Sequence, residues 1–235
     1  MGFRPHSAPP GTASHHNVVP LTPRLKPAKP RIVRISPEND GLELLYANDR
    51  HPDTLFSVRI LCWALLDNDQ VVAMVPWLNG VSSCADLADP LNGRWEGYRL
   101  PHSHYLFTEA PQHKANELRS ALKFFGSASG NKEVVQEVPD SIGTHAVFTA
   151  DGFHSIHLQE VISWRLYGDG QLQAMVIEPG EITNTPVIPG DPCLHPAQEQ
   201  ATFRYFFQHQ VANRIKERDP ETLAAISVLA GRQDQ

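Results

Sequence analysis

The sequence lacks long apolar runs and contains little cysteine. Its longest uninterrupted apolar run, Ile60 to Leu66, is much shorter than the roughly 18 residues that a membrane-spanning helix needs. The first residues also lack the apolar region of a secretory signal. Only three cysteines occur, an odd number without the close paired spacings of zinc ribbons or redox motifs. We therefore expect a cytoplasmic protein with reduced thiols and no membrane partner.

Several nucleotide-binding and catalytic motifs are missing as well. The Walker pattern, the glycine fingerprint of dinucleotide-binding folds and the Gly-x-Ser-x-Gly elbow of serine hydrolases do not occur. These absences disfavour ATP, GTP and NAD chemistry at the usual sites, and catalysis by an activated serine. Hydrophobic residues make up 41% of the chain, which is enough to bury a core, so we expect most of it to fold.

Acidic residues are missing from the N-terminal part of the chain. Six Lys and Arg residues precede the first acid, Glu38, whereas the rest of the chain has 14 basic and 26 acidic residues. Residues 1–30 also contain seven prolines, which remove backbone donors and disfavour helix. We predict a disordered, basic, proline-rich arm over 1–30, followed by a single domain over 31–235.

The role of this arm is open between several alternatives. It can lie against the acidic body, bind a partner or a phosphate group, or act as a transit segment, although its prolines disfavour the amphipathic helix that a transit segment needs. Aromatic residues do not alternate with its cations, so nucleic-acid binding would rest on charge alone and is disfavoured.

The body of the chain contains an internal similarity. Residues 63–75 align without a gap on residues 164–176, and six of the thirteen positions are identical, including one tryptophan and one methionine in each copy. Each copy alternates apolar residues and has turn residues at its centre, which is typical of a β-hairpin. The alternative is two unrelated hairpins of convergent composition.

This similarity predicts an α+β fold made of internally duplicated β-hairpin units. The repeats would cover about 31–127 and 132–231 and be related by a pseudo-two-fold axis, giving a mostly antiparallel sheet closed by a few helices. Apolar periodicity predicts the helices over 114–125 and 197–218, and Asp219 as an N-cap followed by Pro220 predicts a helix over 219–231. Strands are expected over 31–36, 41–46, 55–65, 71–77, 133–138, 144–149, 156–166 and 172–177.

Two long segments with little periodicity follow the hairpins, over 78–100 and 180–196. Segments of this length without secondary structure are often functional. The first contains a mixture of charged and aromatic side chains suited to a polar ligand: Asp86, Asp89, Arg94, Trp95, Glu96 and Tyr98. We expect a binding or interaction protein that presents both segments to a protein or a polar small molecule and can form a homo-oligomer. The alternative for Trp95 is a side chain that covers the sheet.

A His-x-His pattern suggests a second class of function. His102, His104 and Glu109 follow Gly97, and this fragment resembles the first metal motif of the cupin family. The resemblance implies an enzyme that holds iron, manganese or zinc with these three side chains.

The fragment also departs from the cupin pattern. The spacing from Gly97 to His102 is one residue shorter than is typical, and no glycine follows Glu109. The second cupin motif has no close match, and His195 is a distant candidate for its histidine. A metal-dependent enzyme is therefore the alternative to a binding protein without a cofactor.

Overall fold

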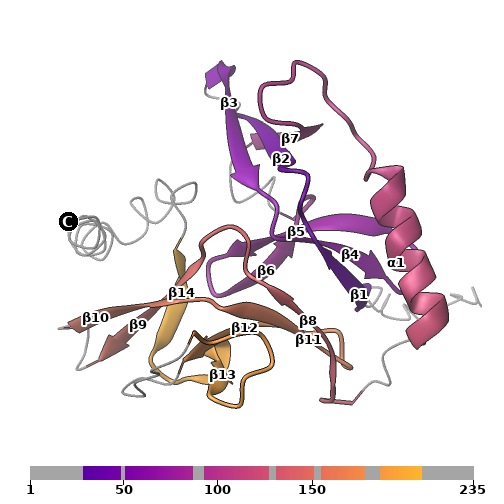
Figure 1. Cartoon of the computed structure of the whole chain (residues 1–235). Coiled ribbons are helices and arrows are strands. Elements are labelled where there is room, and N and C mark those ends of the chain that lie inside the picture. The colour runs from indigo at the N-terminus through magenta and orange to yellow at the C-terminus, as the bar shows by residue number, and fades with distance from the viewer. Residues whose placement is uncertain are drawn as a thin grey trace, which may run out of the picture.

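The computed structural model describes residues 29–48, 51–86, 93–126, 131–150, 155–177 and 186–207. Within these residues the fold is mostly antiparallel β, with four sheets and one α-helix (Figure 1). No helix in this part of the chain is long and apolar enough to cross a membrane. The basic arm up to residue 28 and the helix expected over 219–231 lie outside the described residues.

The first half of the chain forms seven strands and the helix. The strands are β1 (Ile32–Pro37), β2 (Glu43–Asn48), β3 (His51–Arg59), β4 (Cys62–Leu66), β5 (Val71–Trp77), β6 (Gly80–Ser83) and β7 (Gly93–Arg99). They form one sheet of order β1-β4-β5-β6 and another of order β3-β2-β7. The helix α1 (Gln112–Phe125) contacts β1 and β4, as Figure 1 shows at the side of the first sheet.

The second half forms seven strands in the same sheet orders. They are β8 (Val134–Pro139), β9 (His145–Ala150), β10 (Ser155–Glu160), β11 (Ser163–Tyr167), β12 (Leu172–Ile177), β13 (Leu194–Pro196) and β14 (Phe203–Phe207), with the short 3-10 helix η2 (Ala197–Glu199) before the last. The sheets run β8-β11-β12-β13 and β10-β9-β14. Each strand therefore takes the place of the strand seven positions earlier.

The registers of the two halves also correspond. Trp63 on β4 lies opposite Ala73, and Trp164 on β11 lies opposite Ala174. Each indole ring is fully buried and packs against an aromatic ring of the seventh strand of its half. The ring centroids are 4.9 Å apart for Trp63 and Tyr98, and 5.1 Å apart for Trp164 and Phe206.

A carboxylate holds the corner after the first strand of each half. In the first half, the buried Glu38 accepts hydrogen bonds from the indole of Trp63 and from the backbone N–H groups of Asp40 and Leu42. Gly41, three positions after Glu38, has φ of 73°, in the left-handed region that glycine adopts without strain. The carboxylate therefore links the corner to the central tryptophan.

The second half has the same corner. Asp140 accepts from the indole of Trp164 at 2.8 Å and from the backbone N–H groups of three residues that follow it: Ile142, Gly143 and Thr144. Gly143 has φ of 71°, close to the value at Gly41. Both corners follow the sequence pattern Pro, acid, two residues, Gly.

The two halves share their buried clusters. Ile35, Cys62 and Ala64, on one face of the sheet β1-β4-β5-β6, lie in the same cluster as Val138 and Trp164 of the second half. The side-chain amide of Gln136 on β8 also bonds both backbone groups of Ile35, at 3.1 Å and 2.6 Å. The core is therefore continuous across the two halves.

One contact between the halves is not symmetric. The backbone N–H of Phe206 donates to the carbonyl of Leu78 in the first half at 2.7 Å. The equivalent N–H, that of Tyr98, donates instead to Phe107 of its own half at 2.7 Å. A two-fold axis would place the same surface of both halves in contact. This contact has no symmetric counterpart, and the pseudo-two-fold arrangement that we expected from the sequence stays a prediction.

Several expected elements differ from the structure. The helix expected over 197–218 is wrong up to residue 207, because this part contains η2 and β14 and its aromatic residues pair with β9. The rest of that range lies outside the described residues. The strands expected over 55–65 and 156–166 are each divided by a corner into strands of two different sheets.

The segment 78–100 is not the irregular loop that we expected. Its described part contains β6 and β7, which belong to two different sheets. In the other segment, 180–196, the described residues 186–193 are irregular and β13 follows them. The helix expected over 114–125 is confirmed as α1, which ends before Gly126 as its sequence indicates.

Candidate functional site

The residues predicted to bind a ligand lie in different environments. Tyr98 is buried in the core, where burial raises the pKa of its hydroxyl. Trp95 is half-buried and packs on Tyr98, with ring centroids 5.1 Å apart. Among the described residues the buried indole N–H of Trp95 has no hydrogen-bond partner. The packing of Trp95 on Tyr98 fits the alternative in which Trp95 covers the sheet.

The charged members of that set do not form one cluster with them. Asp86 is exposed after β6 and pairs with Lys29, whereas Arg94 and the half-buried Glu96 belong to β7 in another sheet. Asp89 lies outside the described residues. The described members of this set thus lie on separate elements, and a common binding surface for the six residues stays a prediction.

The predicted metal ligands are exposed and lie in an irregular segment. His102 is in a turn with φ of 64°, and neither His104 nor Glu109 belongs to a strand. A strand would place both imidazoles on one face, but these residues do not lie on a strand here. Within the described ranges, no three His, Cys, Asp or Glu side chains are grouped as a metal site requires. The metal site stays a sequence-based prediction without ligand geometry.

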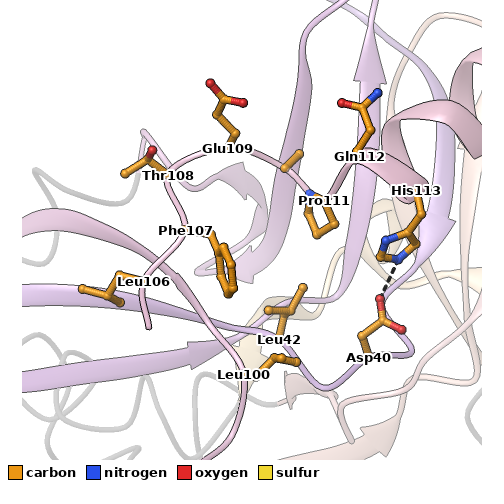
Figure 2. Close-up of a pocket in the computed structure, with 11 residues that line it drawn as sticks. Asp40, Leu42, Leu100, Leu106, Phe107, Thr108, Glu109, Pro111, Gln112 and His113 are labelled. Carbon is orange, nitrogen blue, oxygen red and sulfur yellow. Dashed lines mark hydrogen bonds and ion pairs between the residues drawn. The ribbon is translucent and has the colours of Figure 1, made fainter. Parts of the chain in front are cut away.

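The same segment forms one wall of a groove. Residues 100–111 turn back along β7, and Phe107 exchanges two backbone hydrogen bonds with Tyr98, of 2.7 Å and 2.9 Å. The segment then leads directly into α1. Between it and the loop around Asp40 lies a cavity of about 830 Å³ (Figure 2).

The centre of this groove is apolar and its ends are polar. Leu42, Leu100, Leu106 and Phe107 line it, and the last three side chains are 39%, 45% and 47% exposed. Figure 2 shows Phe107, Leu42 and Leu100 gathered at the centre.

Polar groups also lie along the groove. At one end His113 Nε2 lies 2.8 Å from Asp40 Oδ2. Glu109 also lines the groove, and Figure 2 shows its carboxylate pointing away from Phe107, Leu42 and Leu100. We name this site, which comprises Asp40, Leu42, Leu100 and residues 106–113, the Phe107 groove.

Gly97 allows the wall of this groove to approach β7. Its φ is 140°, and a Cβ atom there would lie 2.5 Å from the carbonyl oxygen of Phe107. In the second half the equivalent position of β14 is Tyr205, as the pairing with β9 shows. A side chain at that position is incompatible with a returning segment like 100–111. Tyr205 therefore does not leave the room that Gly97 leaves for the carbonyl of Phe107.

Replacing Gly97 by alanine is expected to displace Phe107 from β7. The strained backbone and the loss of the two hydrogen bonds should lower the free energy of unfolding by about 2–3 kcal/mol. Amide hydrogen exchange at Phe107 should become faster as well. Gly80→Ala is the control, because nothing lies within 4 Å of a Cβ there. Equal losses in the two variants would contradict this account.

A partial signal for the Phe107 groove is present in the sequence, although our interpretation did not use it. Leu100 and the run Tyr105 to Phe107 are large apolar residues in an otherwise polar segment. Our interpretation assigned this segment to metal binding because of its histidines. Asp40 and His113 could not be linked from the sequence, since 73 positions separate them.

Comparison with known proteins adds no relative to these observations. No protein-family model, no curated protein and no solved structure matches the chain.

Proposed function

We propose that the protein is a binding or interaction protein and that the Phe107 groove is its binding surface. The observation that carries this proposal is the group of three half-exposed large side chains, Leu100, Leu106 and Phe107, over one cavity. Neighbouring exposed apolar side chains are typical of interaction sites, and aromatic anchors contribute much of the binding energy at interfaces. The volume of about 830 Å³ falls within the usual range of ligand sites.

The charges around the groove favour a partner with a basic group. Asp40 and Glu109 are the carboxylates that line it, and the chain after the N-terminal arm carries an excess of acid. A peptide segment of another protein, with an apolar residue next to Lys or Arg, would match both the floor and the ends. The apolar side chain would contact Phe107, and the cation would lie near Glu109.

A random peptide library displayed on phage tests this proposal. We expect the wild-type protein to enrich peptides with an aromatic or aliphatic residue beside Lys or Arg. Leu106→Asp should weaken the binding of the selected peptides by at least about tenfold, because a carboxylate would be buried against their apolar side chain. Phe124→Asp is the control, since Phe124 is 84% exposed on α1 and does not line the groove.

Two results would contradict the proposal. One is a library selection without enrichment of such peptides. The other is a selected peptide that both aspartate variants bind equally weakly, since binding would then not depend on the Phe107 groove.

We further propose that the two halves arose by duplication of one seven-strand unit. Three correspondences support this: the equal strand orders, the carboxylate corners around Trp63 and Trp164, and the register shift in both seventh strands. Convergence would have to reproduce all three independently. The repeats would then have diverged mainly where they contact each other and at the Phe107 groove.

We propose the cytoplasm as the compartment. None of the three cysteines forms a disulfide, and two of them, Cys62 and Cys84, are buried. Burial raises the pKa of the Cys62 thiol, so this thiol has little of the reactive thiolate form. Free buried thiols are typical of proteins from a reducing compartment.

A further inference from the structure

A second groove lies where the described chain begins. It has a volume of about 670 Å³ and lies over one face of the sheet β1-β4-β5-β6, and we name it the Met74 groove. Lys29, Pro30 and Arg31 line it, together with residues of the turn between β11 and β12. Its floor is formed by apolar side chains of this sheet: Ile32, Leu66, Val72, Met74 and Val81.

The first described residues are fixed against this groove by polar contacts. Lys29 Nζ lies 2.7 Å from Asp86 Oδ2, and this hydrogen bond holds the pKa of Asp86 below its ordinary value. The carbonyl of Arg31 accepts from the backbone N–H of Asp67 at 2.9 Å. The Lys29–Asp86 pair is exposed and contributes less than about 1 kcal/mol to stability, but it shows where the chain enters the groove.

The residues that precede Lys29 match the groove in chemistry. Residues 21–28 read Leu-Thr-Pro-Arg-Leu-Lys-Pro-Ala and contain two leucines, two cations and no acid. Two carboxylates, Asp86 and Asp169, line the groove. The apolar floor fits the leucines, and the carboxylates fit the cations.

The prolines of this segment favour an extended conformation with three residues per turn. In that conformation Lys26 shares a face with Lys29, which is already paired with Asp86. Leu25 and Ala28 share a different face. One face of the segment can thus meet the acidic side of the groove while another meets its apolar floor.

We propose that residues 21–28 dock in the Met74 groove, with Leu25 on the floor and Lys26 toward the carboxylates of Asp86 and Asp169. The groove is then a receptor for a basic proline-rich segment, and the chain's own arm is its occupant. This site is separate from the Phe107 groove and does not depend on the function proposed there.

Limited digestion of the full chain with trypsin tests the docking. Arg24–Leu25 is the only bond within residues 1–30 that trypsin cuts readily, because proline follows Arg4, Lys26 and Lys29. In the wild-type protein we expect slow cleavage at Arg24, since a docked segment does not fit the active site of the protease. Cleavage of this kind reports the population of the undocked segment.

Val72→Arg should speed cleavage at Arg24 by about tenfold, because it places a cation on the floor of the groove and repels the arm. Gln173→Arg is the matched control, since Gln173 is equally half-buried at the equivalent position of β12. It should leave the rate within about twofold of the wild type. Asp86→Lys should also speed cleavage at Arg24. Because Asp86 is exposed, this change is not expected to unfold the protein. It therefore tests whether faster cleavage in Val72→Arg comes from undocking of the arm and not from unfolding.

Fast cleavage at Arg24 in the wild type would overturn the proposal. The proposal would also be overturned if the Val72→Arg and Gln173→Arg variants were cleaved at Arg24 at equal rates and Asp86→Lys were cleaved at the wild-type rate. Slow cleavage in the wild type with fast cleavage in both groove variants would support it, provided that the thermal unfolding midpoint of Asp86→Lys equals that of the wild type.

Discussion

Replacing Glu38 by alanine is expected to lower the free energy of unfolding by about 3–5 kcal/mol. The variant removes the acceptor of three N–H groups at once: the indole of Trp63 and the backbone N–H groups of Asp40 and Leu42. Each buried N–H donor that is left unsatisfied costs about 1–3 kcal/mol. This cost is smaller when water reaches the donor. Glu38→Gln should lose less, because its remaining oxygen still accepts from the backbone.

Denaturant unfolding followed by tryptophan fluorescence measures this effect. Asp140→Ala should give a comparable loss, because Asp140 holds the equivalent corner around Trp164. Glu43→Ala is the control, since its 3.8 Å pair with Arg99 is partly exposed and worth less than about 1 kcal/mol. If Glu38→Ala were no more destabilised than Glu43→Ala, the carboxylate corner would not stabilise the fold as we describe.

The second large effect is expected for the Glu137 network on the sheet β8-β11-β12-β13. Glu137 pairs with Arg165 at 2.9 Å and also accepts from Ser163 Oγ and from the backbone N–H of Gly190. The side chains of Glu137 and Arg165 are only 13% and 15% exposed. Glu137→Ala leaves a mostly buried guanidinium without its carboxylate and should cost about 2–4 kcal/mol.

A swap to the residues of the first half should recover most of this loss. By register, Glu137, Ser163 and Arg165 correspond to Ile35, Cys62 and Ala64. The triple variant Glu137→Ile, Ser163→Cys, Arg165→Ala leaves no unpaired charge and should unfold within about 1 kcal/mol of the wild type. Light scattering should accompany the unfolding measurement, because the variant exposes a new apolar face. A triple variant as unstable as Glu137→Ala would show that the cost does not come from the unpaired Arg165.

The hairpins and the helix were predictable because local residues determine them. Asp69 and Gly170, in the turns of the two hairpins, both have positive φ. Asp and Gly are residue types that favour such turns. The apolar stripe of α1 and the terminating Gly126 are also local signals. Strand order was not predictable in this way, since it depends on pairings between residues that are distant in the sequence.

The aromatic run before residue 208 shows why one helix prediction was wrong. Phe203 and Phe207 are four positions apart, a spacing that fits a helical stripe, but both belong to β14. Pairing with β9 and packing of Phe206 against Trp164 decide in favour of a strand. Tertiary contacts thus outweigh a short periodic signal.

The wall of the Phe107 groove could not be predicted in full, because it depends on a close approach between two backbone segments. Only the structure shows that Gly97 leaves room for the carbonyl of Phe107. The carboxylate corners, by contrast, were visible in the sequence. The pattern Pro, acid, two residues, Gly occurs after both first strands, at Pro37 and at Pro139, and it extends the internal similarity well beyond the hairpins.

The two equivalent sheet faces differ in what can pack on them. The apolar face with Ile35, Cys62 and Ala64 packs against residues of the second half, whereas its counterpart carries the Glu137–Arg165 salt bridge, and the backbone N–H of Gly190 donates to the same Glu137. Another chain placed on that counterpart would have to desolvate the salt bridge without replacing its partners. We therefore expect this face to resist association with further copies of the protein.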